Sequence, residues 1–133
     1  MKKTERKTVA VVMNEEHELL PQQIELLRQE FGEETTYWNR RIPKEGMSLQ
    51  KQRLLALHLV VADRVDVVFV SPVPIILAEV VRLREQFGVG GRVFILVNPR
   101  REKVEVEGLI QYRVPKEGWE LYEVKRGDKI VDL

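Results

Sequence analysis

Basic and amide side chains gather where two of the predicted strands end. The residues concerned are Asn39, Arg40 and Arg41 after one strand, and Asn98, Arg100 and Arg101 after another. Guanidinium groups bind phosphate oxygens through paired, charge-assisted hydrogen bonds. Helices that start at the same edge would add free N–H groups and a partial positive charge. The pattern predicts an anion-binding site, and the alternative is solvated surface charge beside Glu45 and Glu102.

Two further strand-end loops add a histidine and small polar residues, namely Asn14, Glu16 and His17 in one loop and Ser71 and Pro72 in the other. His17 is the only residue of these loops that titrates near neutral pH, so it is the candidate catalytic acid or base. Alternatively, His17 forms a hydrogen bond to the backbone at the start of a helix and has no catalytic role. Asn14, Asn98 and Ser71 can equally be turn formers.

Several classes of site are excluded by composition. The chain has no cysteine and two histidines, so thiolate zinc sites, iron–sulfur clusters and disulfides are ruled out, as are multi-histidine metal sites. No Gly-x-Gly-x-x-Gly or Walker A sequence follows a predicted strand, so we expect no dinucleotide or other cofactor. Lys and Arg total 22 against 21 Asp and Glu, which excludes a broadly basic DNA-binding surface.

The elements that must position these residues alternate between strand and helix. Hydrophobic patterning predicts strands over 8–13, 35–38, 65–71 and 92–97, and helices over 20–31, 48–62 and 74–87. Residues 39–46 are predicted to be a loop. An alternating β-α order favours a parallel sheet, in which ligands bind outside the carboxyl ends of the strands.

The spacing of apolar residues predicts which side of each helix faces the sheet. The predicted inner residues are Leu20, Ile24, Leu27 and Phe31 in the first helix, Leu54, Leu57 and Val61 in the second, and Ile76, Val80, Leu83 and Phe87 in the third. Leu55 and Leu59 widen the apolar side of the second helix. A helix this apolar is either deeply buried or packed against a partner chain.

The chain changes character after residue 98. Polar and apolar residues alternate over 103–107, 111–114 and 119–125, which predicts antiparallel strands, with a turn at 116–118 between the last two. We therefore predict an α/β fold with a mostly parallel, Rossmann-like sheet flanked by helices and a C-terminal antiparallel β-hairpin. The expected organisation is a single domain, 1–133, with β-α units over 1–98 and a hairpin extension over 99–133. No stretch has the character of a signal peptide, so we expect a cytoplasmic protein.

The stretch from Asn14 to Gln23, which reads NEEHELLPQQ, resembles the small CRISPR-associated Rossmann-like proteins that bind cyclic oligoadenylates. The apolar second helix, the valine-rich third strand ending in Ser71-Pro72 and the terminal hairpin fit the same layout. The resemblance implies a homodimer that holds a cyclic oligoadenylate, with cyclic tetra-adenylate as the first choice, across its two-fold axis. It also implies that the arginine pairs neutralise phosphates.

Some proteins of this kind are metal-independent ring nucleases, in which a ribose 2′-hydroxyl attacks the phosphodiester, and others only sequester the messenger. The resemblance leaves both open, and His17 is the candidate acid or base for cleavage. Two other hypotheses stand beside it. One is a non-enzymatic homodimeric interaction module that uses the second helix. The other is a hydrolase or transferase acting on another phosphorylated small molecule.

Overall fold

The computed structural model describes residues 8–63, 65–71, 73–88, 91–98, 102–113 and 117–124. Its elements, in chain order, are β1 (Thr8–Asn14), α1 (Pro21–Phe31), β2 (Thr36–Ile42), α2 (Leu49–Leu57), the π-helical segment η1 (His58–Asp63), β3 (Asp66–Phe69), α3 (Pro74–Phe87), β4 (Val93–Val97), β5 (Glu102–Val106), β6 (Leu109–Arg113) and β7 (Glu120–Val124). No helix among these residues is long and apolar enough to cross a bilayer.

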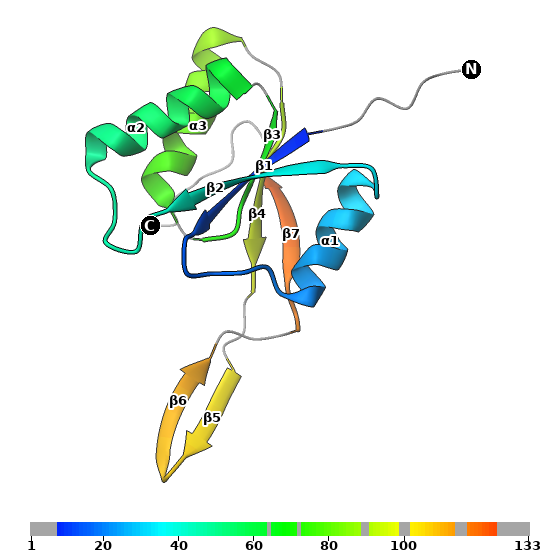
Figure 1. Ribbon diagram of the computed structural model, residues 1–133, viewed down its shortest axis with the longest axis vertical. Helices are drawn as coiled ribbons and strands as arrows, with labels where there is room; N and C mark the ends of the chain where they lie inside the picture. The colour runs from blue at the N-terminus through cyan, green and yellow to red at the C-terminus, as the bar shows by residue number, and fades with distance from the viewer. Residues whose placement is uncertain are drawn as a thin grey trace.

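Five strands form one sheet in the order β2-β1-β3-β4-β7 (Figure 1). The first four are parallel, and β7 pairs antiparallel with β4 at the edge. This arrangement confirms the predicted Rossmann-like α/β fold. The central strands β1 and β3 are buried along most of their length because helices cover both faces of the sheet.

The two faces of the sheet carry separate cores, with α2 and α3 on one side and α1 on the other (Figure 1). On one face, α2, η1 and α3 pack against alternate strand residues such as Ala10, Val12 and Val67. On the other face, α1 packs through Leu27 and Phe31 against a set that includes Phe94, and the two rings meet edge to face at 5.1 Å. Successive residues of each strand point to opposite faces, so one strand serves both cores.

The bounds of α1 and α3 agree closely with prediction, and Gly32 and Gly88 end them with positive φ angles. The residues on the inner faces of these two helices differ in part from the predicted ones. Leu27 and Phe31 are buried but Ile24 is half exposed, and Gln23 takes an inner position because its side chain accepts the Leu20 N–H. In α3 the prediction holds for Ile76, Val80 and Leu83, whereas Phe87 lies in the last turn and is exposed.

The predicted loop after the second strand is wrong, because β2 continues to Ile42 and includes Asn39, Arg40 and Arg41. Each of these residues is paired in register with β1, for example Arg41 with Met13. An edge strand has only one neighbouring strand and remains partly exposed to solvent, so it tolerates charged side chains that a central strand does not. Pairing with the buried β1 therefore overrides the low strand propensity of Asn.

The predicted inner face of the second helix is only partly right, because Leu55 and Leu59 pack inward as predicted but its three main residues do not. Leu54, Leu57 and Val61 are exposed, whereas Ala56, Leu59 and Val60 are buried against the sheet. The α-helix ends at Leu57 and continues as η1, whose wider winding turns the following residues relative to a regular helix. Ser48 caps α2 as predicted, by accepting the Lys51 N–H.

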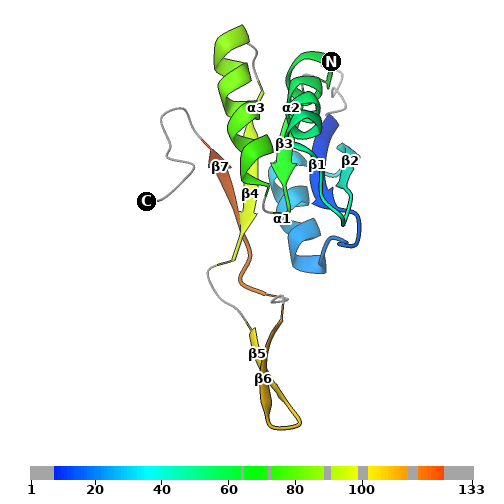
Figure 2. The same cartoon turned by 90° about the vertical axis from the view of Figure 1, so that its left-hand side faces the viewer.

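The C-terminal hairpin exists, but its strands are not the predicted pair. β5 pairs with β6 through a two-residue turn at Glu107 and Gly108, and β7 joins the main sheet. Both turn residues have positive φ, as a type I′ hairpin turn requires. The hairpin β5–β6 projects from the body of the molecule in both ribbon views (Figures 1 and 2), and we call it the arm.

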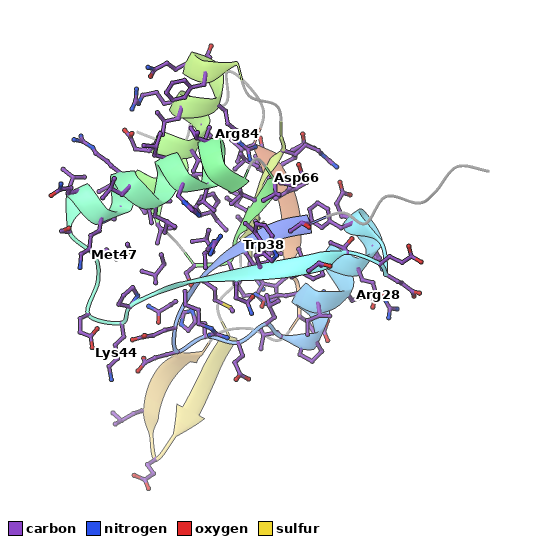
Figure 3. The ribbon with its side chains drawn as sticks, turned by 45° about the horizontal axis from the view of Figure 1, so that its top comes forward. Arg28, Trp38, Lys44, Met47, Asp66 and Arg84 are labelled. Carbon is purple, nitrogen blue, oxygen red and sulfur yellow. The ribbon has the colours of Figure 1, made fainter. Side chains whose placement is uncertain are left out.

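Buried polar groups stabilise the amino edge of the sheet, where β3 and β4 start. The Arg84 side chain is buried and donates to the Val65 carbonyl at 2.7 Å. Asp66 accepts the Arg92 N–H at 2.8 Å, and the Cβ position of Gly91 lies 3.0 Å from the Arg84 guanidinium. Figure 3 shows Arg84 and Asp66 at this end of the sheet and Lys44 at the opposite end.

Candidate functional site

The carboxyl ends of β1 and β3 are joined by a hydrogen-bonded group of three predicted site residues. Ser71, which follows β3, accepts the backbone N–H of Asn14 through its hydroxyl oxygen at 2.9 Å. The same Oγ lies 3.1 Å from Nδ1 of His17. Ser71 is 6% exposed, whereas His17 is exposed. A buried hydroxyl therefore holds an accessible imidazole at the edge of the sheet.

The loop that carries His17 is shaped by Asn14. The Asn14 side chain accepts the Glu16 N–H at 3.0 Å, and its backbone carbonyl accepts the His17 N–H at 3.0 Å. Asparagine forms such turns readily because its short side chain can replace a backbone acceptor. The turn-forming role of Asn14 is thus realised, and it places His17 beside Ser71.

Arg41 braces the same loop from the neighbouring strand β2. Its Nη1 donates to the carbonyls of Glu15 and His17, each at 3.1 Å. The backbone N–H of Lys44 donates to the Glu15 carboxylate at 2.9 Å, and the Lys44 ammonium lies 3.7 Å from Glu16. Arg41 therefore orders the backbone around His17, and its Nε and Nη2 form no hydrogen bond with a described residue.

The first turn of α3 adds N–H donors to this edge. Pro74 is the first helical residue, and the Leu77 N–H makes the first helical bond, to the Val73 carbonyl. The N–H groups of Ile75 and Ile76 precede that bond, so they have no partner within the helix. They carry the partial positive charge of a helix N-terminus and follow Ser71 closely in the chain.

The two arginines on β2 point to opposite faces of the sheet, because neighbouring residues of a strand alternate. Arg41 braces the loop on the α1 side, as described, and Asn39 is exposed on that side. Arg40 lies on the α2 side, where its guanidinium carbon is 5.7 Å from the ring centroid of Trp38. Arg40 is therefore part of a surface pair with Trp38 and does not join His17.

Of the remaining predicted residues the structure describes only Asn98, which bonds to a different segment of the chain. Asn98 follows β4, and its side-chain amide donates to the Glu117 carbonyl at 2.8 Å. That bond joins the two chain segments from which the arm projects, so Asn98 closes the base of the arm. Pro72, Arg100 and Arg101 lie outside the described residues.

Sequence reasoning missed the bracing roles of Arg41 and Lys44, which both fix the loop through backbone or carboxylate contacts. The local sequence carries no signal for these roles, because Tyr37 and Trp38 are both aromatic and the three residues that follow are all polar, without the alternation that marks a strand. Within the described residues no group of three or more His, Cys, Asp or Glu side chains could hold a metal ion.

Comparisons with family models, with curated proteins and with solved structures found no match to this chain.

Proposed function

We propose that the carboxyl edge of the sheet binds a cyclic oligoadenylate, with cyclic tetra-adenylate as the first choice. The observation that carries this proposal is the bond between His17 and Ser71, which joins the loops after two adjacent parallel strands. Parallel α/β sheets bind ligands at this edge. The resemblance of the Asn14 to Gln23 stretch to cyclic oligoadenylate-binding proteins names the ligand class.

The chemistry of the edge suits a phosphodiester. Arg41 supplies guanidinium N–H groups, and the first turn of α3 supplies backbone N–H groups. The nearby carboxylates of Glu15 and Glu16 are engaged by Lys44. A cyclic tetra-adenylate has a two-fold axis, so a two-fold homodimer would present one such edge to each half of the ring.

The position of His17 is suited to proton transfer if the ligand is cut. Ser71 Oγ already accepts the Asn14 N–H, so its own proton can be donated to Nδ1 of His17. In that tautomer Nε2 carries the imidazole proton. When Nδ1 is protonated as well and donates to Ser71 Oγ, the cationic ring can deliver its Nε2 proton to the leaving 5′-oxygen and becomes neutral. The 2′-hydroxyl would pass its proton to a water molecule as its oxygen attacks the adjacent phosphorus, and the bond from phosphorus to the 5′-oxygen would break, giving a 2′,3′-cyclic phosphate end. Ser71 acts as a positioning residue in this scheme.

Binding is tested by titrating the purified chain with cyclic tetra-adenylate and cyclic hexa-adenylate in a calorimeter. We expect a dissociation constant in the micromolar range or below, which rises with salt because phosphates are neutralised. Arg41→Ala should weaken binding about tenfold, the effect of losing one charge-assisted contact. Arg28→Ala is the matched control, since Arg28 is exposed near the far end of α1 and pairs with Glu25. The proposal would be refuted if wild type did not bind at 100 micromolar, a dissociation constant that corresponds to a binding free energy of about −5.5 kcal/mol.

Cleavage is tested by chromatography of the same mixtures after incubation in EDTA. Linear products from wild type, with a rate at least a hundredfold lower in His17→Ala and unchanged affinity, would assign the acid or base role to His17. Binding without linear products would identify a messenger-sequestering protein. Equal competition by AMP or inorganic phosphate would instead favour a site for another phosphorylated small molecule.

A further inference from the structure

The tip of the arm exposes two large apolar side chains. Leu109 and Ile110 follow the turn at Glu107 and Gly108, and they are 67% and 65% exposed. These are the highest exposures among the large hydrophobic residues of the described part of the chain. A two-stranded ribbon is only marginally stable in water unless a further strand or a helix packs on it. The arm therefore has the character of a segment that docks against another surface.

A second apolar surface lies on the outer side of α2, where it meets α3. There a groove of about 510 Å³ is lined mainly by Leu49, Arg53, Leu54, Leu57, Arg82 and Leu83. Leu54 is 57% exposed, and Leu49 and Leu57 are also exposed. Outer faces of helices are normally polar, so a leucine-lined groove marks an interaction surface.

The charges of the two surfaces are complementary. The arm carries Glu105 and Glu107, both exposed, next to its apolar tip. The groove carries two arginines, Arg53 and Arg82, against one glutamate, Glu79. Arg82 pairs with Glu79 at 2.8 Å and lowers the pKa of that carboxyl group, with Arg53 contributing. The groove thus keeps a net positive charge that matches the acidic tip.

We propose that the arm of one chain binds the α2/α3 groove of a second copy, and that the exchange is reciprocal. The arm projects from the carboxyl edge away from α2 and α3, so it does not reach the groove of its own chain (Figures 1 and 2). Each chain has one arm and one groove, and a two-fold axis pairs both at once and closes the assembly. This inference concerns the interface and does not rest on the proposed ligand.

The first test measures the mass of the full chain by sedimentation at 1 to 100 micromolar. We expect a dimer for wild type and at least a tenfold larger dissociation constant for both Ile110→Glu and Leu54→Glu. Both side chains are exposed, so circular dichroism and the melting temperature should stay close to wild type. Ile24→Glu, at an equally exposed position on α1, is the matched control and should leave the dimer unchanged. A monomeric wild type at 100 micromolar would overturn the proposal.

Mixing the two variants separates arm exchange from a direct α2–α2 contact. In a mixed dimer the intact arm of the Leu54→Glu chain meets the intact groove of the Ile110→Glu chain, so part of the affinity should return. If the helices packed directly on each other, Ile110→Glu would dimerise like wild type, which contradicts the proposal.

Cross-linking gives an independent readout, because the chain has no cysteine of its own. A Leu109→Cys chain mixed with a Leu57→Cys chain should form a disulfide-linked heterodimer under mild oxidation. The mixture of Leu109→Cys with Ile24→Cys should not. Equal cross-linking in both mixtures would show random collision and would overturn the assignment of the groove.

Discussion

The two edges of the sheet hold similar side chains in opposite environments. At the amino edge, Arg84 is 7% exposed and donates to the Val65 carbonyl, and Asp66 beside it is also buried. At the carboxyl edge, Arg41 is exposed and donates to two loop carbonyls, and Glu15 and Glu16 are exposed. Both edges therefore use arginine to bond backbone carbonyls, but Arg84 is buried whereas Arg41 is in contact with solvent.

Burial decides what each of these two arginines can do. Desolvation lowers the pKa of the Arg84 guanidinium from its ordinary value, and the charge of Asp66 opposes that shift. Nε and Nη1 of Arg84 are buried without a hydrogen-bond partner among the described residues. Such a group is committed to stabilising the fold, whereas Arg41 is exposed and can exchange bound water for the phosphate oxygens of a ligand.

The largest effect is expected from Arg84→Ala. Removing the buried guanidinium leaves the Val65 carbonyl without its charged donor and removes the favourable charge interaction with Asp66, so the free energy of unfolding should fall by roughly 3 kcal/mol. The free energy of unfolding is measured by urea denaturation, monitored by circular dichroism. Arg82→Ala is the control, because Arg82 lies two residues earlier on α3 in an exposed pair with Glu79. If both variants unfolded at the same urea concentration, the contrast between buried and exposed arginines would fail.

Gly91→Ala should give the next effect at the same edge. Gly91 has a φ of +123°, and an added Cβ would lie 3.0 Å from the Arg84 guanidinium, which is fixed by its bond to Val65. Strain of this kind costs about 2 kcal/mol. Gly88 also has a positive φ, at +61°, but a Cβ added there would meet no atom within 4 Å. Gly88→Ala should therefore lower the free energy of unfolding by about 1 kcal/mol. Equal melting temperatures of the two variants would argue against crowding of Arg84.

At the carboxyl edge, Ser71→Ala should lower the free energy of unfolding by about 1.5 kcal/mol. The Asn14 N–H then loses its acceptor at a partly buried position. Chemical denaturation gives the stability, and NMR of the imidazole nitrogens should show that His17 exchanges between ring orientations. An unchanged His17 spectrum would indicate that Ser71 does not position the imidazole.

The smallest effect on stability is expected from Arg41→Ala, since the side chain is exposed. Its measurable consequence is local, because the carbonyls of Glu15 and His17 lose their shared donor. Hydrogen exchange of the amides in residues 15–18 should accelerate about tenfold, and the amides of β3 should not change. Unchanged exchange in the loop would show that Arg41 is surface charge and does not brace it.

Much of the site could be predicted from sequence, because its residues follow strands of a parallel sheet. Asn14, His17 and Ser71 are far apart in the chain, yet the β-α pattern predicted that they share one edge, and they are hydrogen-bonded there. The separation of Arg40 from Arg41 was missed, because a loop was expected where β2 continues. Asn98 was predicted to lie in the site, but it closes the base of the arm, which forms because β5 pairs with β6, whereas a pairing of β6 with β7 was predicted.

Periodicity and capping are local properties, so the order of strands and helices along the chain, the parallel core and the helix ends at Gly32 and Gly88 could be read from the sequence. Packing in three dimensions set which strand pairs with β7 and which side of α2 faces the sheet. The alternating C-terminal strands are alike in pattern, so the choice of partner depends on contacts that are distant in sequence. Likewise α2 is apolar on more than one side, so packing, and not its periodicity, left Leu54 and Leu57 exposed at the groove.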